Sequence, residues 1–209
     1  MIRLFDTKTW NQINPPLTAH SLTVARLRFS PDDNLLLSVG RDRQWAIFER
    51  SGSESTEYKL KHSDPKGHSR MILDAAWAPG SSASFATAGR DKSVKLWAKT
   101  EEGYACVKTI KQESPVTAVD FIDMPVEDNS MAWLAVGTEE GRLSYHKIKL
   151  DDLSVVQTIT SAAASCPSKA ITQLAWRPYR GEVGLSKDIE IAVASEDCSL
   201  RVFSLEELE

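Results

Sequence analysis

Apolar and variable positions alternate in four short segments of the chain, each of which ends in an aromatic residue. The final aromatics are Phe29, Trp77, Phe121 and Trp176. Apolar residues recur two and five positions before each aromatic, whereas the side chains between them vary freely. This spacing is typical of β-strands and not of helices. We therefore predict four repeat units, each of which begins with a strand.

Each unit continues with two further predicted strands, and the first three units also have a fourth. The second is a near-continuous apolar run, which predicts burial on both faces of a sheet; the runs cover residues 35–39, 84–88, 132–136 and 189–193. The third ends at Phe48, Trp97, His146 or Phe203, in each case six residues after an acidic residue. The fourth, at 58–60, 105–110 and 155–159, is more polar, as expected for the outer edge of a sheet.

A longer pattern recurs in the first two units. In each copy a His, a Ser or Thr, the tripeptide Gly-Arg-Asp and a strand-final aromatic follow one another, and Asp42 and Asp91 set the period (91 − 42 = 49 residues). Self-similarity at this length indicates a β-propeller, in which each repeat forms one four-stranded blade. The predicted fold class is all-β, a WD40 β-propeller of about four blades.

The predicted strands divide the chain, residues 1–209, into blade-sized segments. Residues 2–6 resemble the third strand at 94–97, and few residues follow the third strand at 200–203, so the chain is expected to begin and end inside blades. The segments are 1–17 (end of a blade), 18–62, 63–111 and 112–160 (blades) and 161–209 (incomplete blade). Because propellers close with roughly four to eight blades, we expect an incomplete arc of a seven-bladed ring, completed by another segment or chain. A closed four-bladed ring is the alternative.

The recurring polar residues are expected to form a hydrogen-bond network inside each blade. In such a network an Asp orients a His, the His meets a Ser or Thr hydroxyl, and the hydroxyl accepts an indole N–H. The second unit has the whole set: His68, Thr87, Asp91 and Trp97. The first has His20, Ser38 and Asp42, but Phe48 cannot donate. The third and fourth units carry Gln112 or Pro167 and Val136 or Val193 at these positions, so their networks are predicted to be lost.

Composition and motifs argue against several functional classes. Ser or Thr, His and Asp together are found in nucleophilic catalysis, but here they stand at repeat positions beside a Trp, which favours a structural role and no catalytic residues. His62, Ser63 and Asp64 are predicted to lie in a polar loop. Three scattered cysteines, without a C-x-x-C motif, predict no metal site and no cofactor. A net charge of −4 gives no overall attraction to nucleic acid or membrane, and no apolar stretch is long enough for a membrane helix.

Basic residues are concentrated in the turns of the first two units. The turn after the second strand and the loop before the first lie on the same face of a propeller, so this face should carry Arg41, Arg43, Arg70, Arg90 and Lys92. In the third and fourth units the same turns contain Glu139 and Glu140 or Glu196 and Asp197, which predicts a positive and a negative half. Such a face suits an anionic partner, a protein or RNA; the alternative is that these charges only cap solvated turns.

Five segments, at 20–24, 36–45, 68–72, 74–79 and 90–97, resemble the family of subunit 2 of the Elongator complex. The resemblance is strongest over residues 18–97 and weaker over 98–209. It implies a second propeller from a longer protein with two consecutive WD40 propellers. It also implies a non-catalytic scaffold in the assembly that modifies wobble uridines of tRNA, in cytoplasm and nucleus. The implied partners are the largest and the catalytic Elongator subunits and the remainder of the same propeller, with tRNA a further candidate.

A second functional hypothesis belongs to a different class. An independent WD40 adaptor, such as a substrate receptor of a ubiquitin ligase, would use the same arginines to bind an acidic or phosphorylated peptide. Direct nucleic-acid binding is a third hypothesis, and it predicts an affinity that falls steeply with salt.

Overall fold

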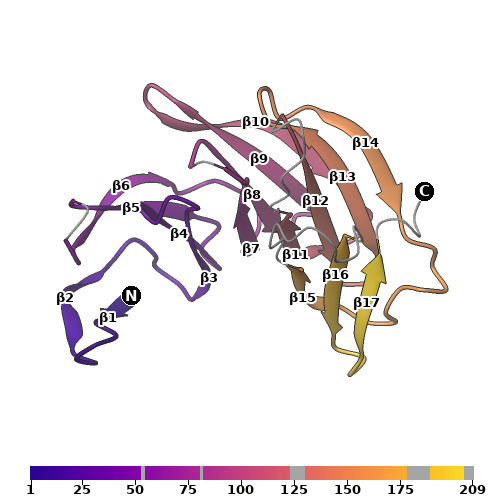
Figure 1. The fold of residues 1–209 in the computed structure, drawn as a ribbon, viewed down its shortest axis with the longest axis horizontal. Helices are drawn as coiled ribbons and strands as arrows, with labels where there is room; N and C mark the ends of the chain where they lie inside the picture. The colour runs from indigo at the N-terminus through magenta and orange to yellow at the C-terminus, as the bar shows by residue number, and fades with distance from the viewer. Residues whose placement is uncertain (53–54, 81, 123–129, 178–188, 205–209) are drawn as a thin grey trace, which may run out of the picture.

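The computed structural model describes residues 1–52, 55–80, 82–122, 130–177 and 189–204, and within these ranges all regular elements are β-strands. The strands form five antiparallel sheets that follow one another along an open arc (Figure 1). The fold-class prediction, an all-β partial propeller, is confirmed. None of the described residues belongs to a helix of the length and apolarity that crossing a membrane requires.

Each sheet is built from strands that are consecutive in the chain. The first sheet contains β1 (Ile2–Phe5) and β2 (Gln12–Leu17). The second contains β3 (Val24–Phe29), β4 (Leu35–Gly40), β5 (Trp45–Arg50) and β6 (Tyr58–Asp64). The third contains β7 (Ile72–Trp77), β8 (Ser84–Gly89), β9 (Ser93–Thr100) and β10 (Gly103–Lys111). The fourth contains β11 (Val116–Phe121), β12 (Met131–Thr138), β13 (Leu143–Lys149) and β14 (Val155–Thr160), and the fifth β15 (Ile171–Trp176), β16 (Glu190–Ser195) and β17 (Leu200–Ser204).

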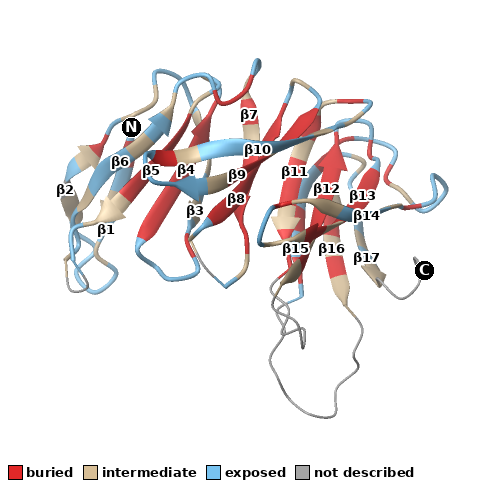
Figure 2. Cartoon of the chain, turned by 90° about the horizontal axis from the view of Figure 1, so that it is seen from above, coloured by how far each residue is buried: buried red, intermediate tan, exposed pale blue. Residues whose placement is uncertain are grey.

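The first strand of each of the last four sheets lies on the inner side of the arc. Strand β7 contacts β3 and β11, and β11 contacts β15, so these strands form the inner wall. The second strands β4 and β8 are buried along their whole length, whereas the outer strands β6 and β10 are largely exposed (Figure 2). This gradient explains why the apolar pattern of the sequence weakens from the second to the fourth strand of each unit.

A β-bulge in each inner strand explains the spacing of its apolar residues. In β7, for example, the register with β8 shifts between Ile72 and Asp74, and β3, β11 and β15 shift at the same place. Positions two and five before the aromatic would face opposite sides of a regular strand, but one extra residue restores them to the same side. Ile72, Ala75 and Trp77 accordingly belong to one buried cluster.

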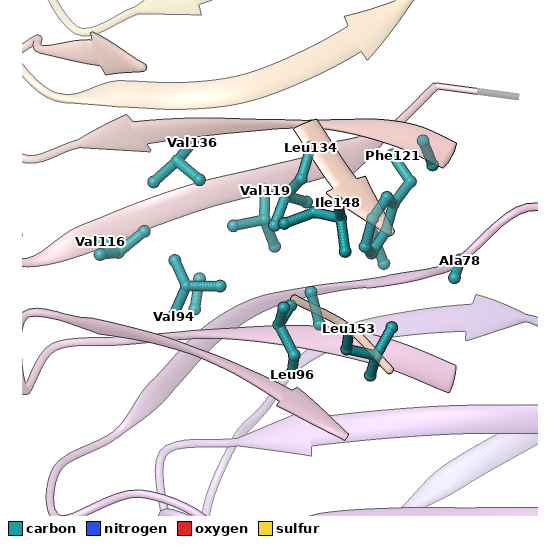
Figure 3. Close-up of a cluster of buried hydrophobic side chains, with 14 residues drawn as sticks. Ala78, Val94, Leu96, Val116, Val119, Phe121, Leu134, Val136, Ile148 and Leu153 are labelled. Carbon is teal, nitrogen blue, oxygen red and sulfur yellow. The ribbon is translucent and has the colours of Figure 1, made fainter. Parts of the chain in front are cut away.

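Buried side chains fill the spaces between neighbouring sheets. The largest cluster joins the third and fourth sheets, with Leu96 from β9 facing Val119 and Leu134 from β11 and β12 (Figure 3). Similar clusters join the second sheet to the third, the fourth to the fifth, and the first to the second. The hydrophobic core is therefore distributed over the interfaces between blades, as expected for repeats that bury their faces only by stacking.

Two tryptophans of the inner strands also join sheets through hydrogen bonds. The indole Nε1–H of Trp77 donates to the backbone oxygen of Arg28, 3.1 Å away in the preceding sheet. Trp176 donates in the same way to the backbone oxygen of Asp120 at 3.0 Å. From the sequence we assigned these residues only to the aromatic column.

The described strands lie within the predicted blade segments, apart from β6, which continues to Asp64. Two strand-level predictions were wrong. His62, Ser63 and Asp64 do not lie in a loop, because β6 pairs with β5 as far as Asp64. The third strands run one to three residues past the column of Phe48, Trp97, His146 and Phe203, because their pairing extends toward the hairpin turns. The sequence also predicts a turn at 177–181 and no fourth strand after residue 204, but residues 178–181 and 205–209 lie outside the described part of the chain.

Candidate functional site

The turn after the second strand has the same geometry in the last four sheets. At its first position the backbone N–H donates to the carbonyl oxygen of the residue just before the inner strand, at 2.9 Å in each of these four sheets. The four donors are Arg41, Arg90, Glu139 and Glu196, and their acceptors are the carbonyls of Thr23, Met71, Pro115 and Ala170. The turn therefore holds two arginines and two glutamates at equivalent places on one face.

Two positions later, each turn has a residue with positive φ. These residues are Arg43 (φ 71), Lys92 (φ 63), Gly141 (φ 80) and Cys198 (φ 66). In the turns of Arg43, Gly141 and Cys198 the backbone N–H of this residue donates to the carbonyl three positions earlier, as Arg43 does to Gly40 at 3.2 Å. A left-handed conformation costs free energy for residues other than glycine. The rigid scaffold thus fixes the backbone from which the side chains of Arg43 and Lys92 project.

All five predicted basic residues are exposed and belong to turns or loops on this face. Arg70, Arg90 and Lys92 line one cavity of about 380 Å³. Arg41 and Arg90 line a second cavity of about 650 Å³, nearer the inner strands. Arg43 lines neither of these two cavities. The structure therefore brings Arg41, Arg70, Arg90 and Lys92 together around two adjoining hollows, with Arg43 on the neighbouring turn.

The positive and negative halves of this face meet in the larger cavity, where Glu139, Glu140 and Glu196 line the opposite wall. Arg90 forms an ion pair with Glu139 at 3.5 Å. The acidic half also contains Arg142, which lies 3.4 Å from a carboxylate oxygen of Glu113. The basic and acidic turns thus meet in one cavity, and one ion pair crosses the boundary between them.

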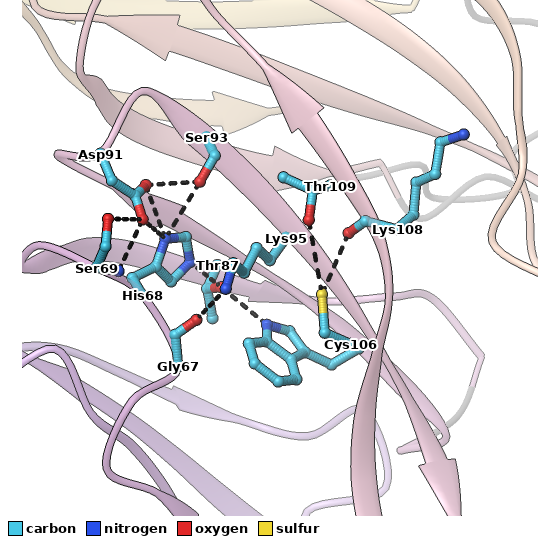
Figure 4. A network of polar contacts seen from close by, with 11 residues as sticks. Gly67, His68, Ser69, Thr87, Asp91, Ser93, Lys95, Cys106, Lys108 and Thr109 are labelled. Carbon is cyan, nitrogen blue, oxygen red and sulfur yellow. Dashed lines mark hydrogen bonds and ion pairs between the residues drawn. The ribbon is translucent and has the colours of Figure 1, made fainter.

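The hydrogen-bond network of the third sheet is continuous (Figure 4). His68 Nδ1 lies 3.0 Å from a carboxylate oxygen of Asp91, and its Nε2 lies 2.7 Å from the Thr87 hydroxyl. The indole N–H of Trp97 donates to the same hydroxyl at 2.9 Å. Thr87 has no exposed surface, and its hydroxyl is already hydrogen-bonded to His68 and Trp97. The hydroxyl is therefore available neither to substrate nor to solvent.

The second sheet has a shorter version of this network. His20 Nδ1 is 3.0 Å from Asp42, and His20 Nε2 is 2.8 Å from the hydroxyl of Ser38. Because Phe48 has no N–H, the Ser38 hydroxyl instead lies 3.2 Å from the backbone oxygen of Ala46. Ser38 is fully buried, like its counterpart in the third sheet.

Both aspartates are held as carboxylates. Burial by itself would raise the pKa of Asp91, but hydrogen bonds from His68 and Ser93 outweigh burial and hold that pKa well below its usual range. The pKa of Asp42 is lowered in the same manner by His20 and the backbone N–H of Ser21, against the effect of burial. These aspartates therefore act as hydrogen-bond acceptors that anchor the loop before each inner strand.

The fourth sheet has a replacement network that the sequence reasoning missed. His146 stands at the position of Trp97, and its Nδ1 lies 3.0 Å from the Thr158 hydroxyl. Its Nε2 lies 3.2 Å from the hydroxyl of Ser144 and 3.5 Å from the amide nitrogen of Gln112. The prediction that this unit keeps no polar network was wrong, because a His in the tryptophan column forms its own contacts. Burial lowers the pKa of His146 to about 4, so the ring is neutral.

The fifth sheet keeps the aspartate of the network and replaces the rest. Asp197 accepts the backbone N–H of Ser168 at 3.0 Å and the hydroxyl of Ser199 at 2.5 Å. Arg201 lies 3.5 Å from the same carboxylate and donates to the carbonyl of Ser165 at 2.7 Å. The carboxylate thus fastens the loop before the inner strand even where the histidine position is Pro167.

A buried charge cluster on the inner wall was not predicted from the sequence. Arg26 Nε lies 2.7 Å from Asp74, and Arg28 lies 3.7 Å from the same carboxylate oxygen. The other oxygen of Asp74 accepts the backbone N–H of Val119 at 3.2 Å. Burial raises the pKa of neighbouring Asp120 to about 6, because it outweighs the hydrogen bond from the Trp176 backbone, which lowers that pKa. These charged residues stand at the variable positions between the apolar residues of the inner strands. The sequence pattern therefore did not indicate that adjacent blades would enclose them.

Among the described residues, no three His, Cys, Asp or Glu side chains are grouped as metal ligands. The buried hydroxyls and the exposed basic turns define different roles, one internal and one at the surface. The fold and these sites together are those of a WD40-repeat propeller. Residues 11–49 and 59–98 match the WD40 family, described as WD domain, G-beta repeat.

Comparison with known proteins extends this likeness over nearly the whole chain. The chain is similar to Elongator complex protein 2 of Saccharomyces cerevisiae, with 35% identity over 209 residues, covering 98% of the chain and 25% of that protein. The protein of the same name from Schizosaccharomyces pombe is 37% identical over 207 residues, covering 98% of the chain and 26% of its own length. The Homo sapiens protein of the same name is 30% identical over 202 residues, covering 87% of the chain and 24% of its own length. The resemblance predicted from the sequence is confirmed, and the chain spans about a quarter of the length of these relatives.

Proposed function

We propose that the chain is a non-catalytic propeller segment that helps to assemble an Elongator complex. The observation that carries this proposal is the similarity to Elongator complex protein 2 along 98% of the chain. In this role the propeller binds the largest and the catalytic subunits and so supports modification of wobble uridines of tRNA, in cytoplasm and nucleus. The buried networks stabilise the blades, and the exposed turns provide the contacts.

The basic turns are the part of the surface best suited to an assembly interface. Arg41, Arg43, Arg70, Arg90 and Lys92 are exposed on one face of a rigid scaffold. Arginine presents a planar fork of donors that can bind a carboxylate or phosphate with two hydrogen bonds. Charge complementarity of this kind mainly sets the rate and specificity of association.

The test is to replace Arg41, Arg43, Arg70 and Arg90 together with Ala in the full-length protein and to purify the complex through another subunit. We expect a normal melting temperature but reduced recovery of the variant with the complex. The matched control replaces three exposed lysines away from these turns, namely Lys8, Lys59 and Lys108, and should leave recovery unchanged. Full recovery of the arginine variant would contradict the role of this face.

An independent peptide-binding adaptor, such as a ubiquitin-ligase substrate receptor, is the second candidate. The cavity lined by Arg70, Arg90 and Lys92 favours it, since three cationic side chains around one hollow suit a phosphorylated or acidic peptide. Affinity purification separates the two functions: Elongator subunits support the first, and ligase components support the second. A direct contact with tRNA would add binding that weakens steeply with salt.

The remainder of the propeller is a further proposed partner. Apolar side chains are exposed on the first inner strand, β3, at Leu27 (42%) and Phe29 (54%), and on the last strand, β17, at Leu200 (73%) and Val202 (62%). In a propeller such faces pack against the next blade. We expect the chain alone to self-associate in sedimentation and to unfold with low cooperativity. A cooperative monomer would contradict the proposal that further blades complete the ring.

A further inference from the structure

A further cavity, of about 240 Å³, opens between the second and third sheets on the face opposite to the basic turns. Its walls come from the turns after the first and third strands, which in an up-and-down sheet lie at the other end of the strands from the Gly-Arg-Asp turns. Glu49, Lys61 and His62 belong to the second sheet, and Lys99 and Tyr104 to the third. The cavity therefore requires both blades.

The carboxylates of the cavity are already occupied by neighbouring donors. Asp32 accepts the hydroxyl of Ser30 at 2.5 Å and the hydroxyl of Ser82 at 3.3 Å. Glu49 forms an ion pair with Lys61. The cations of the lining, Arg50, Lys61 and Lys99, outnumber its two carboxylates, so the cavity favours an anion over a cation.

Other lining groups keep unused hydrogen-bond donors. Within the described parts of the chain, Lys99 forms no ion pair and its ammonium makes no hydrogen bond. The ring nitrogens of His62 likewise have no hydrogen-bond partner among the described residues. Burial and the nearby Lys61 lower the pKa of His62, so at neutral pH its ring is an uncharged donor.

The position of His62 is fixed by the hairpin of the third sheet. Its ring lies edge-on to the ring of Tyr104, with centroids 5.9 Å apart and an interplanar angle of 75°. Gly103 has φ +145, and a Cβ there would lie 3.0 Å from His62 Nδ1, so this position favours glycine. The Tyr104 hydroxyl donates to the carbonyl of Ser82 at 2.6 Å and ties the hairpin to the neighbouring turn. The cavity is thus preformed.

We propose that this cavity binds a compact oxyanion at the end of a side chain of a partner protein, with Lys99 supplying the charge and His62 a hydrogen bond. The volume holds one carboxylate or phosphate with its linking carbons but no folded element. Glutamate or aspartate and a phosphorylated residue share this chemistry. The site does not depend on the basic turns, since it lies on the opposite face.

The test uses nuclear magnetic resonance of the full-length protein with selectively labelled histidine and tyrosine, and the ring signals of His62 and Tyr104 are the reporters. The probes are N-acetyl-glutamate N-methylamide and N-acetyl-phosphoserine N-methylamide, and the neutral comparison is N-acetyl-glutamine N-methylamide. We expect saturable shifts at millimolar concentration for the two anions and not for the amide. The tighter of the two anions identifies the carboxylate or the phosphate as the source.

Two lysines of the same hairpin provide a matched pair of variants. Lys99→Met keeps the length of the side chain and removes its charge, and it should weaken binding about tenfold or more. Lys108→Met removes a charge from the exposed surface of β10, outside the cavity, and should leave binding unchanged. Unsaturable shifts, equal shifts with the neutral amide, or undiminished binding to Lys99→Met would each overturn the proposal.

Discussion

Two buried ionisable groups of the fourth sheet should have opposite effects on stability as the pH falls. His146 is buried in its polar network and has a pKa of about 4, compared with an ordinary value of 6.5. Asp120 lies in the inner charge cluster beside Arg28, Asp74 and Arg26, and burial raises its pKa to about 6 from 3.8. The fold shifts the pKa of each group in favour of its neutral form, but one group is a base and the other an acid.

The sign of each effect follows from which state binds more protons. Between pH 6.5 and 4 the unfolded chain protonates His146 and the folded chain does not, so this group lowers the free energy of unfolding as the pH falls. Between pH 6 and 4 the folded chain keeps a proton on Asp120 that the unfolded chain has lost. Asp120 therefore raises the free energy of unfolding over nearly the same interval. One pKa unit corresponds to about 1.4 kcal/mol, so each effect reaches about 3 kcal/mol and the two nearly cancel.

The variants His146→Gln and Asp120→Asn separate the two effects. Gln retains hydrogen-bonding groups for Ser144 and Thr158, and Asn keeps an oxygen to accept the Trp176 N–H. Relative to the parent chain, His146→Gln should gain about 3 kcal/mol of stability between pH 6.5 and 4, and Asp120→Asn should lose about 3 kcal/mol between pH 6 and 4.

The assay is urea unfolding of the full-length protein at closely spaced pH values, followed by a probe in the fourth sheet, with the free energy obtained from the midpoint and slope. The double variant provides the control, since it should restore the pH dependence of the parent chain. If either single variant keeps the parent's pH dependence to within about 1 kcal/mol, the corresponding group is not buried as the structure indicates and the reasoning fails.

Two further predictions concern buried contacts. Thr87→Val leaves the indole N–H of Trp97 and the Nε2 of His68 without a partner, and should destabilise the protein by about 2–5 kcal/mol. Ser38→Ala affects only the Nε2 of His20 and should cost about 1–3 kcal/mol. Equal losses in urea unfolding would argue against the indole contact. Leu134→Ala removes a side chain with no exposed surface and should cost about 2–5 kcal/mol, while Leu22→Ala, at a residue 59% exposed, should change the same free energy by less than about 0.5 kcal/mol.

The fold was largely predictable because its signals are local. Strand alternation and turn residues need only a few neighbouring positions, and repetition of these signals distinguishes a propeller from other sheets. Bulges were hidden in the same pattern: the apolar spacing of β7 already contained the extra residue between Ile72 and Asp74. The pattern did not reveal that His146 would take over the polar role of a tryptophan, because a network of different residues has no fixed spacing.

The cavity around His62 and the inner charge cluster could not be predicted for a different reason. The burial of Asp74 and Asp120 depends on how closely neighbouring sheets pack, not on their own strands. The cavity around His62 likewise requires the hairpin of the next sheet, whose Tyr104 forms part of its wall. Properties that arise between repeats are absent from the pattern within a repeat. The basic turns could be predicted from the sequence because each turn belongs to one repeat.

The hydrogen bonds that link adjacent inner strands have a consequence for how such a protein can evolve. Trp77 joins the second and third sheets through its indole, but the equivalent aromatic in the fourth sheet is Phe121, and there the Asp74 carboxylate binds the backbone N–H of Val119 instead. Each joint involves only the two sheets that meet there. Its chemistry can therefore be exchanged without rebuilding the next joint. Repeats in such an array can diverge one boundary at a time while the arc keeps its curvature.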